Sequence, residues 1–75
     1  MSTDEKLIYM ANQIAAFFAA QGREKAVPAI ADHLNRFWDP HMRRRFLKIA
    51  GDHKTTMTAL VTEALPLVKV PTPTQ

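Results

Sequence analysis

Three histidines, His33, His41 and His53, are the side chains of this sequence best suited to acid–base or metal chemistry. Two imidazoles can hold one metal ion from a single helix when they are three or four residues apart, and these three are spaced more widely. The chain has no cysteine, which excludes disulfides and thiolate ligands. No carboxylate pair or nucleophile motif accompanies the histidines. The sequence therefore predicts no catalytic residue, no metal site and no cofactor site.

Positive charge is concentrated in the segment IADHLNRFWDPHMRRRFL, residues 30–47, which holds four of the five arginines. Arginine side chains bind phosphates, which favours a freestanding helical nucleic-acid-binding or regulatory domain. They pair equally well with carboxylates across protein interfaces, which favours a partner contact through Arg43, Arg44 and Arg45. A net charge of +3 is too small to decide between the two hypotheses.

Helical periodicity in the rest of the chain predicts four short helices and no strand. The first is expected to open at Ser2, in a Ser-x-x-Glu capping box with Glu5, and to stop at Gly22. The second begins near residues 23–25, because Pro28 is tolerated only within or close to a first turn. The third runs from Pro40 to Gly51. The fourth is expected from about Asp52 to Leu65, closed by Pro66.

Each expected helix carries an apolar stripe that would face a common core. The inward-facing residues are expected to be Leu7, Ala11, Ile14, Ala15, Phe18, Val27, Ile30, Ala31, Leu34, Phe37, Trp38, Met42, Phe46, Ile49, Met57, Leu60, Val61, Ala64 and Leu65. Asp39 is suited to cap the third helix, with Pro40 at its first position. A structural corner is therefore predicted from Leu34, Trp38, Asp39, Pro40, Met42 and Phe46.

The chain of 75 residues is expected to form one all-α domain, a small compact bundle of three to four short helices. Residues 1–68 are assigned to this domain, and residues 69–75 to an extended, proline-rich tail that is mobile or bound by a partner. A domain of this size is marginally stable alone and often depends on association. Asp4 and Glu5 stand where a signal peptide would have its basic region, so none is expected.

The first expected helix is unusual because residues 7–22 contain no charged side chain. Polar residues interrupt a run that is too short to span a membrane. A solvated helix face normally carries charges, whereas the side away from the core holds Tyr9, Asn12, Gln13, Ala16, Ala19 and Ala20. We expect Asn12, Ala16 and Ala19 to meet a partner, with Asn12 hydrogen-bonding across the contact. The alternative is an alanine-rich exposed face selected for helix propensity.

Three stretches of the sequence, MANQIAAFF, IADHLNRFWDPHMRRRFL and LVTEALPLV, resemble the small delta subunit of cytoplasmic NAD-dependent, molybdenum-containing formate dehydrogenases. The likeness covers about residues 7–68. Its most specific portion is the block in which His33, Phe37, Trp38, Pro40, Met42 and Arg43 follow one another in the family's order.

The resemblance implies a cytoplasmic accessory subunit that binds no cofactor and supports assembly or stability of the complex. In that family the large alpha subunit carries a molybdenum–pterin centre and iron–sulfur clusters, and the beta and gamma subunits pass electrons to FMN and NAD. The partners implied are therefore the alpha, beta and gamma subunits. Neither nucleic acid nor a membrane is expected as a partner.

Overall fold

The computed structural model describes residues 3–53 and 56–70 and is all-α, as the periodicity predicts. Its four α-helices are α1 (Thr3–Phe18), α2 (Arg23–Phe37), α3 (Pro40–Ala50) and α4 (Ala59–Ala64). Three short 3-10 turns follow α1, α3 and α4, namely η1 (Ala19–Gln21), η2 (Gly51–His53) and η3 (Leu65–Leu67). Across these described residues no strand occurs, and no helix is long and apolar enough to cross a membrane.

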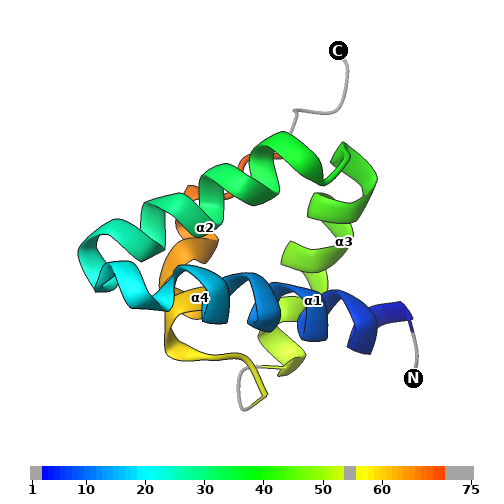
Figure 1. Cartoon of the computed structure of the whole chain (residues 1–75). Helices are drawn as coiled ribbons and strands as arrows, with labels where there is room; N and C mark the ends of the chain where they lie inside the picture. Colours follow the sequence, from blue (N-terminus) through cyan, green and yellow to red (C-terminus); the bar gives the residue numbers. More distant parts are fainter. Residues whose placement is uncertain (1–2, 54–55, 71–75) are drawn as a thin grey trace.

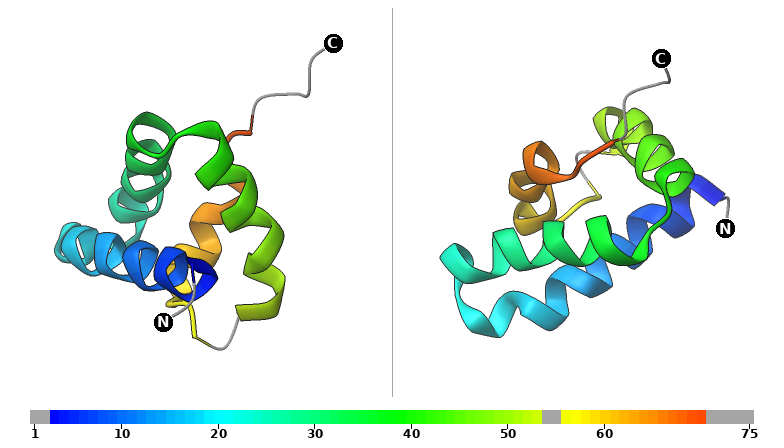
Figure 2. Two further views of the ribbon diagram at one scale, coloured as in Figure 1. Left: turned by 90° about the vertical axis from the view of Figure 1, so that its right-hand side faces the viewer. Right: turned by 90° about the horizontal axis from the view of Figure 1, so that it is seen from above.

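Helices α1 and α2 lie side by side in opposite directions, and α3 and α4 pack on the other side of this pair (Figures 1 and 2). The chain reverses between α1 and α2 at Gly22. Its φ of 91° lies in a region of backbone conformation that residues other than glycine rarely adopt. The Gly22 carbonyl accepts hydrogen bonds from Lys25 N and Ala26 N at 3.1 and 2.8 Å, which starts α2 directly after the reversal.

A second change of direction, between α2 and α3, is built around Asp39 and Trp38. The Asp39 carboxylate accepts a hydrogen bond from Met42 N at 2.8 Å and so caps α3, with Pro40 at its first position. Trp38 is 6% exposed, and its ring meets that of Phe46 edge-on with centroids 5.4 Å apart. Leu34 and Phe46 are fully buried, and Met42 is partly buried and packs against the core cluster.

The core lies between the two helix pairs. Its least exposed large side chains are Ile30, Leu34, Phe46 and Val61, one or more from each of α2, α3 and α4. Helix α1 contributes Leu7, Ile8, Ala11 and Ala15. Because Ala11 and Ala15 are small, α2 and α3 can approach α1 closely. Among the described residues no charged or polar residue falls in the buried class.

Phe37 is a correction to the expected apolar stripe of α2, because its side chain is 71% exposed. Trp38 is the C-terminal cap of α2, where the backbone is already extended (φ −92°, ψ 133°), so its side chain does not follow the helical spacing of Phe37. Trp38 turns inward at the corner, and Phe37 remains outside on α2.

The fourth helix is shorter than the periodicity indicated. It begins at Ala59 because the Thr58 hydroxyl caps it, accepting from Val61 N at 3.4 Å, and Met57 is buried before the helix starts. Gly51–His53 forms a separate 3-10 turn, so the predicted start at Asp52 is wrong. Pro66 lies in η3 directly after the helix.

The C-terminal segment stays in contact with α2 beyond residue 68, where the tail was expected to begin. Val68 is buried, and Lys69 N donates to Asn35 Oδ1 at 2.7 Å while Asn35 Nδ2 donates to the Leu67 carbonyl at 3.1 Å. One asparagine on α2 therefore holds two backbone groups of this segment, one on either side of Val68. The remainder of the predicted tail, 71–75, and the predicted cap at Ser2 lie outside the described residues.

Candidate interaction surfaces

The solvent side of α1 is the first candidate surface, and we call it the α1 outer face: Tyr9, Gln13, Ala16, Ala19 and Ala20. All five residues are exposed, and none is charged. The Tyr9 hydroxyl accepts a hydrogen bond from Gln13 Nε2 at 3.1 Å, which keeps these two side chains together on the surface. The predicted interface residues Ala16 and Ala19 thus lie on a smooth, uncharged strip.

Asn12, the third residue expected at this interface, is occupied within the chain. Its Nδ2 donates to the Thr56 carbonyl at 2.8 Å, and its Oδ1 accepts from Thr58 N at 3.0 Å. The side chain is half-buried. Its amide thus attaches the segment before α4 to α1, and the expected hydrogen bond from Asn12 to a partner stays a prediction.

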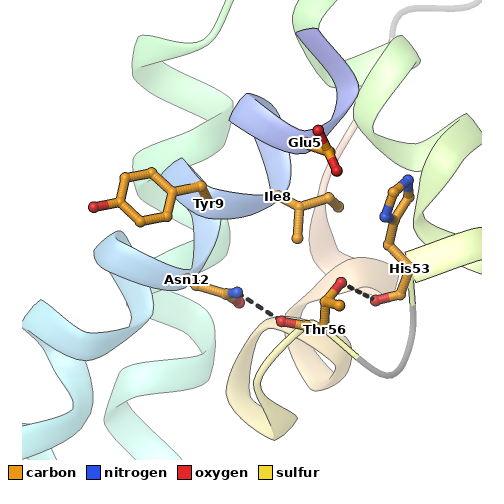
Figure 3. A pocket seen from close by; sticks show the side chains of 6 residues that line it. All are labelled: Glu5, Ile8, Tyr9, Asn12, His53 and Thr56. Carbon is orange, nitrogen blue, oxygen red and sulfur yellow. Dashed lines mark hydrogen bonds between the residues drawn. The ribbon is translucent and has the colours of Figure 1, made fainter. Parts of the chain in front are cut away.

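A pocket of about 440 Å³ lies beside Asn12, between α1 and the segment that follows α3 (Figure 3). Its lining residues are Glu5, Ile8, Tyr9, Asn12, His53 and Thr56. The Thr56 hydroxyl donates to the His53 carbonyl at 3.0 Å, and the Tyr9 ring points away from the pocket centre. The Asn12 amide and the Thr56 hydroxyl are thus both hydrogen-bonded to backbone groups of the chain itself.

The three histidines occupy three separate environments. His33 stacks between Phe18 and Phe37, with ring centroids 6.0 and 4.8 Å away, His41 is exposed on α3, and His53 lines the pocket described above. Throughout the described part of the chain, no group of three His, Cys, Asp or Glu side chains is placed to hold a metal ion.

Two of the three arginines assigned to the interface are engaged inside the chain. Arg45 makes two hydrogen bonds of 2.8 Å to the Asp4 carboxylate, which joins α3 to the start of α1. This contact lowers the pKa of Asp4 and raises that of Arg45, chiefly through the hydrogen bonding itself. Arg43 Nη1 donates to Asn35 Oδ1 at 3.4 Å, and its Nε is buried without a hydrogen-bond partner in the described structure.

Two further arginines are paired with carboxylates of the chain itself. Arg36 pairs with Asp32 at 3.0 Å on α2, and Arg23 pairs with Glu63. Arg44 is exposed and has no ion pair with any described residue. Because carboxylates of the chain itself take up three of the five arginines, the structure offers little support for the nucleic-acid hypothesis.

A second candidate surface is an apolar groove of about 490 Å³ between α1 and α2, which we call the α1–α2 groove. It is lined by Met10, Gln13, Ile14, Phe17, Phe18, His33 and Trp38. Three of the lining rings form a connected row, in which Phe17 contacts Phe18 edge-on at 5.1 Å and Phe18 contacts His33. Phe37 contacts His33 and continues the row beyond the lining. The two end rings, Phe17 and Phe37, are 76% and 71% exposed.

The sequence did not predict this groove, because Phe37 was assigned to the core and Phe17 to neither side of α1. One signal was present. Phe17 and Phe18 are neighbours on one helix, where side chains point about 100° apart, and Phe18 belongs to the expected apolar stripe, which leaves Phe17 at the edge of that stripe.

Comparison with known protein families gives a match over most of the chain. The family model described as "NADH-dependant formate dehydrogenase delta subunit FdsD" matches residues 6–65, from the first turn of α1 through the end of α4. No curated protein and no solved structure matches the chain at a significant level.

Proposed function

Because the chain belongs to the family of delta subunits of NADH-dependent formate dehydrogenase, we propose that it is a non-catalytic accessory subunit that binds the large alpha subunit and supports assembly or stability of the complex. The observation that carries this proposal is the α1 outer face, where five exposed residues lack any charge. A solvated helix face normally carries charged side chains. Small residues such as Ala16 and Ala19 permit a close backbone approach by a partner.

Oxidation of formate to CO2 with reduction of NAD is assigned to the other subunits. The alpha subunit would hold the molybdenum–pterin centre and iron–sulfur clusters, and the beta and gamma subunits would use FMN and NAD, all in the cytoplasm. Each histidine of this chain lies in a separate environment, which supports an accessory role. We expect the purified chain to oxidise no formate and to contain neither molybdenum nor iron by elemental analysis. Stoichiometric metal would contradict the proposal.

Substitution of Ala16 by Arg tests the binding surface. A large charged side chain on a closely packed, desolvated contact is strongly unfavourable without a counter-charge. The same substitution on a solvated helix face is nearly neutral for folding. We therefore expect Ala16→Arg to keep the helicity and melting temperature of the free chain but to lose co-purification with the large subunit.

Ala59→Arg is the matched control, since Ala59 is exposed at the start of α4, outside the α1 outer face. This variant should co-purify as the wild type does. Normal assembly of Ala16→Arg would mean that the α1 outer face is solvated in the complex. Unfolding of the free Ala16→Arg chain would show that the face packs against the chain itself.

A further inference from the structure

The guanidinium of Arg43 is incompletely satisfied within the chain. An arginine side chain has five N–H donors, whereas Arg43 makes a single hydrogen bond to the described residues, from Nη1 to Asn35 Oδ1 at 3.4 Å. Its Nε is buried, and no described residue accepts a hydrogen bond from it. Because the residue is half-buried, part of its positive charge is shielded from water, which is unfavourable for a charge that is not paired.

The described part of the chain supplies no counter-charge for this arginine. None of its carboxylates forms an ion pair with Arg43. Asp39, one turn before Arg43 in the sequence, accepts a hydrogen bond from Met42 N as the cap of α3. Asp32, one turn before the residue that Arg43 contacts, pairs with Arg36 at 3.0 Å. The carboxylates that stand one helical turn away are therefore engaged elsewhere.

A second cation lies beside Arg43. Lys69 N donates to the same Asn35 oxygen at 2.7 Å, which brings the C-terminal segment against the junction of α2 and α3 (Figure 2). Lys69 is exposed and has no ion pair with a described residue. We call this place the Asn35 seam: Asn35, Arg43 and Lys69. Two positively charged residues thus meet at one neutral amide oxygen.

We propose that the Asn35 seam receives a carboxylate, the side chain of an Asp or Glu of a partner subunit, which pairs with Arg43 and Lys69. This inference rests on the proposed function and adds a contact outside the α1 outer face. Because Arg43 is already half-buried and bonded to Asn35, the pairing restricts its side chain little further. A guanidinium is planar and weakly hydrated, which suits it to carboxylates at protein interfaces.

The seam fits one carboxylate better than a row of phosphates. Affinity for nucleic acid comes from several cations that follow the phosphate backbone together. Arg36 on α2 and Arg45 on α3 are each paired with a carboxylate of the chain itself. Arg44 points about 100° away from Arg43 around α3. Two cations therefore remain at the seam, which matches a single acidic side chain.

Neutralising Arg43 tests the proposal. Arg43→Gln removes the charge but keeps an amide that can donate to Asn35. We expect this variant to bind the partner subunits about tenfold more weakly. The melting temperature of the free chain should be no lower than that of the wild type, because a half-buried unpaired charge has been removed.

Lys48→Gln is the matched control, since it removes one positive charge from an exposed position of the same helix. It should bind as the wild type does. Equal binding of Arg43→Gln and Lys48→Gln would overturn the proposal. A lower melting temperature of Arg43→Gln would also overturn it, because Arg43 would then stabilise the fold of the free chain.

Carbodiimide cross-linking in the assembled complex identifies the carboxylate. The reagent joins a lysine amine to a carboxylate in contact with it, and Lys69 supplies the amine in the wild-type chain. We expect mass spectrometry to show Lys69 joined to an Asp or Glu of a partner subunit. The variant Arg43→Lys should give a second cross-link to the same partner peptide, whereas Lys48 should not reach it.

The outcomes separate this proposal from the proposed function. If the wild-type chain co-purifies with partner subunits but Lys69 couples to none of their carboxylates, the carboxylate site alone is contradicted. If the wild-type chain co-purifies with no partner subunit, the proposed function fails as well. A shift of duplex DNA at physiological salt that is lost in Arg43→Gln would assign the seam to nucleic acid and overturn the proposal.

Discussion

At the scale of single residues, Trp38 and Phe37 show how neighbours in the sequence take opposite roles. Trp38 is 6% exposed and packs on Phe46, whereas Phe37 is 71% exposed and stacks on His33. Trp38 stabilises the turn between α2 and α3, and Phe37 offers an apolar ring at the surface.

Replacing Trp38 by Ala should destabilise the isolated chain by about 3–5 kcal/mol, the usual cost of removing a large buried side chain. Domains of this size have little stability in excess of that value. Urea denaturation followed by circular dichroism measures the change. The matched control is Phe37→Ala, which should change the free energy of unfolding by less than about 1 kcal/mol because the ring is exposed. Equal effects of the two substitutions would show that the assignment of the corner is wrong.

Asn12 has a role inside the chain that the sequence did not predict. Its amide holds the Thr56 carbonyl and Thr58 N, so Asn12→Ala removes two hydrogen bonds from the segment before α4. We expect a loss of roughly 1–3 kcal/mol in the free energy of unfolding. Amide hydrogen exchange at Met57 and Thr58 should also become faster. Gln13→Ala, which removes only a surface bond to Tyr9, should leave both measurements nearly unchanged. The role assigned to Asn12 fails if the two variants behave alike.

At the scale of elements, polar side chains fix how the helices are joined. Asp4 and Arg45 connect α1 to α3, Asn12 connects α1 to the segment before α4, and Asn35 connects α2 to the segment after η3. Each contact joins residues more than thirty positions apart. Packing of small apolar residues leaves the relative positions of short helices loosely determined, and these contacts restrict them.

The Asp4–Arg45 pair makes the free energy of unfolding depend on pH in the acid range. Hydrogen bonding to Arg45 lowers the pKa of Asp4 below its ordinary 3.8, so the carboxylate is stabilised in the folded state. The pair's contribution is complete above the ordinary pKa and is lost as the pH falls through the lowered pKa of the folded state. Asp4→Asn should therefore weaken the fall in melting temperature between about pH 5 and about pH 2.

Asp52→Asn is the control for this pH series, since Asp52 is exposed and has no ion pair within the described residues. Its melting temperature should follow that of the wild type at each pH. If Asp4→Asn shows the same pH dependence as the wild type, then the pair does not contribute to stability.

At the scale of the whole molecule, the sequence predicted the features that depend on local chemistry. The Asp39 cap, Pro40 at the start of α3 and the reversal at Gly22 follow from residue type and neighbours, and all are present. Contacts between distant residues could not be predicted this way. Arg45 looked available for a partner because nothing in its neighbourhood of the sequence marks Asp4, forty-one positions away, as its counterpart. The groove was missed for a related reason, since it depends on how α1 and α2 lie together.

The most direct test of the central claim, that a partner subunit covers the α1 outer face, is hydroxyl-radical footprinting of the chain alone and in the assembled complex. Tyr9 and the neighbouring Phe17 are 51% and 76% exposed in the free chain and should react readily. In the complex their oxidation should fall about tenfold, while exposed His41 on α3 serves as the reference. Unchanged oxidation of Tyr9 and Phe17 in a complex that contains the chain would contradict the claim.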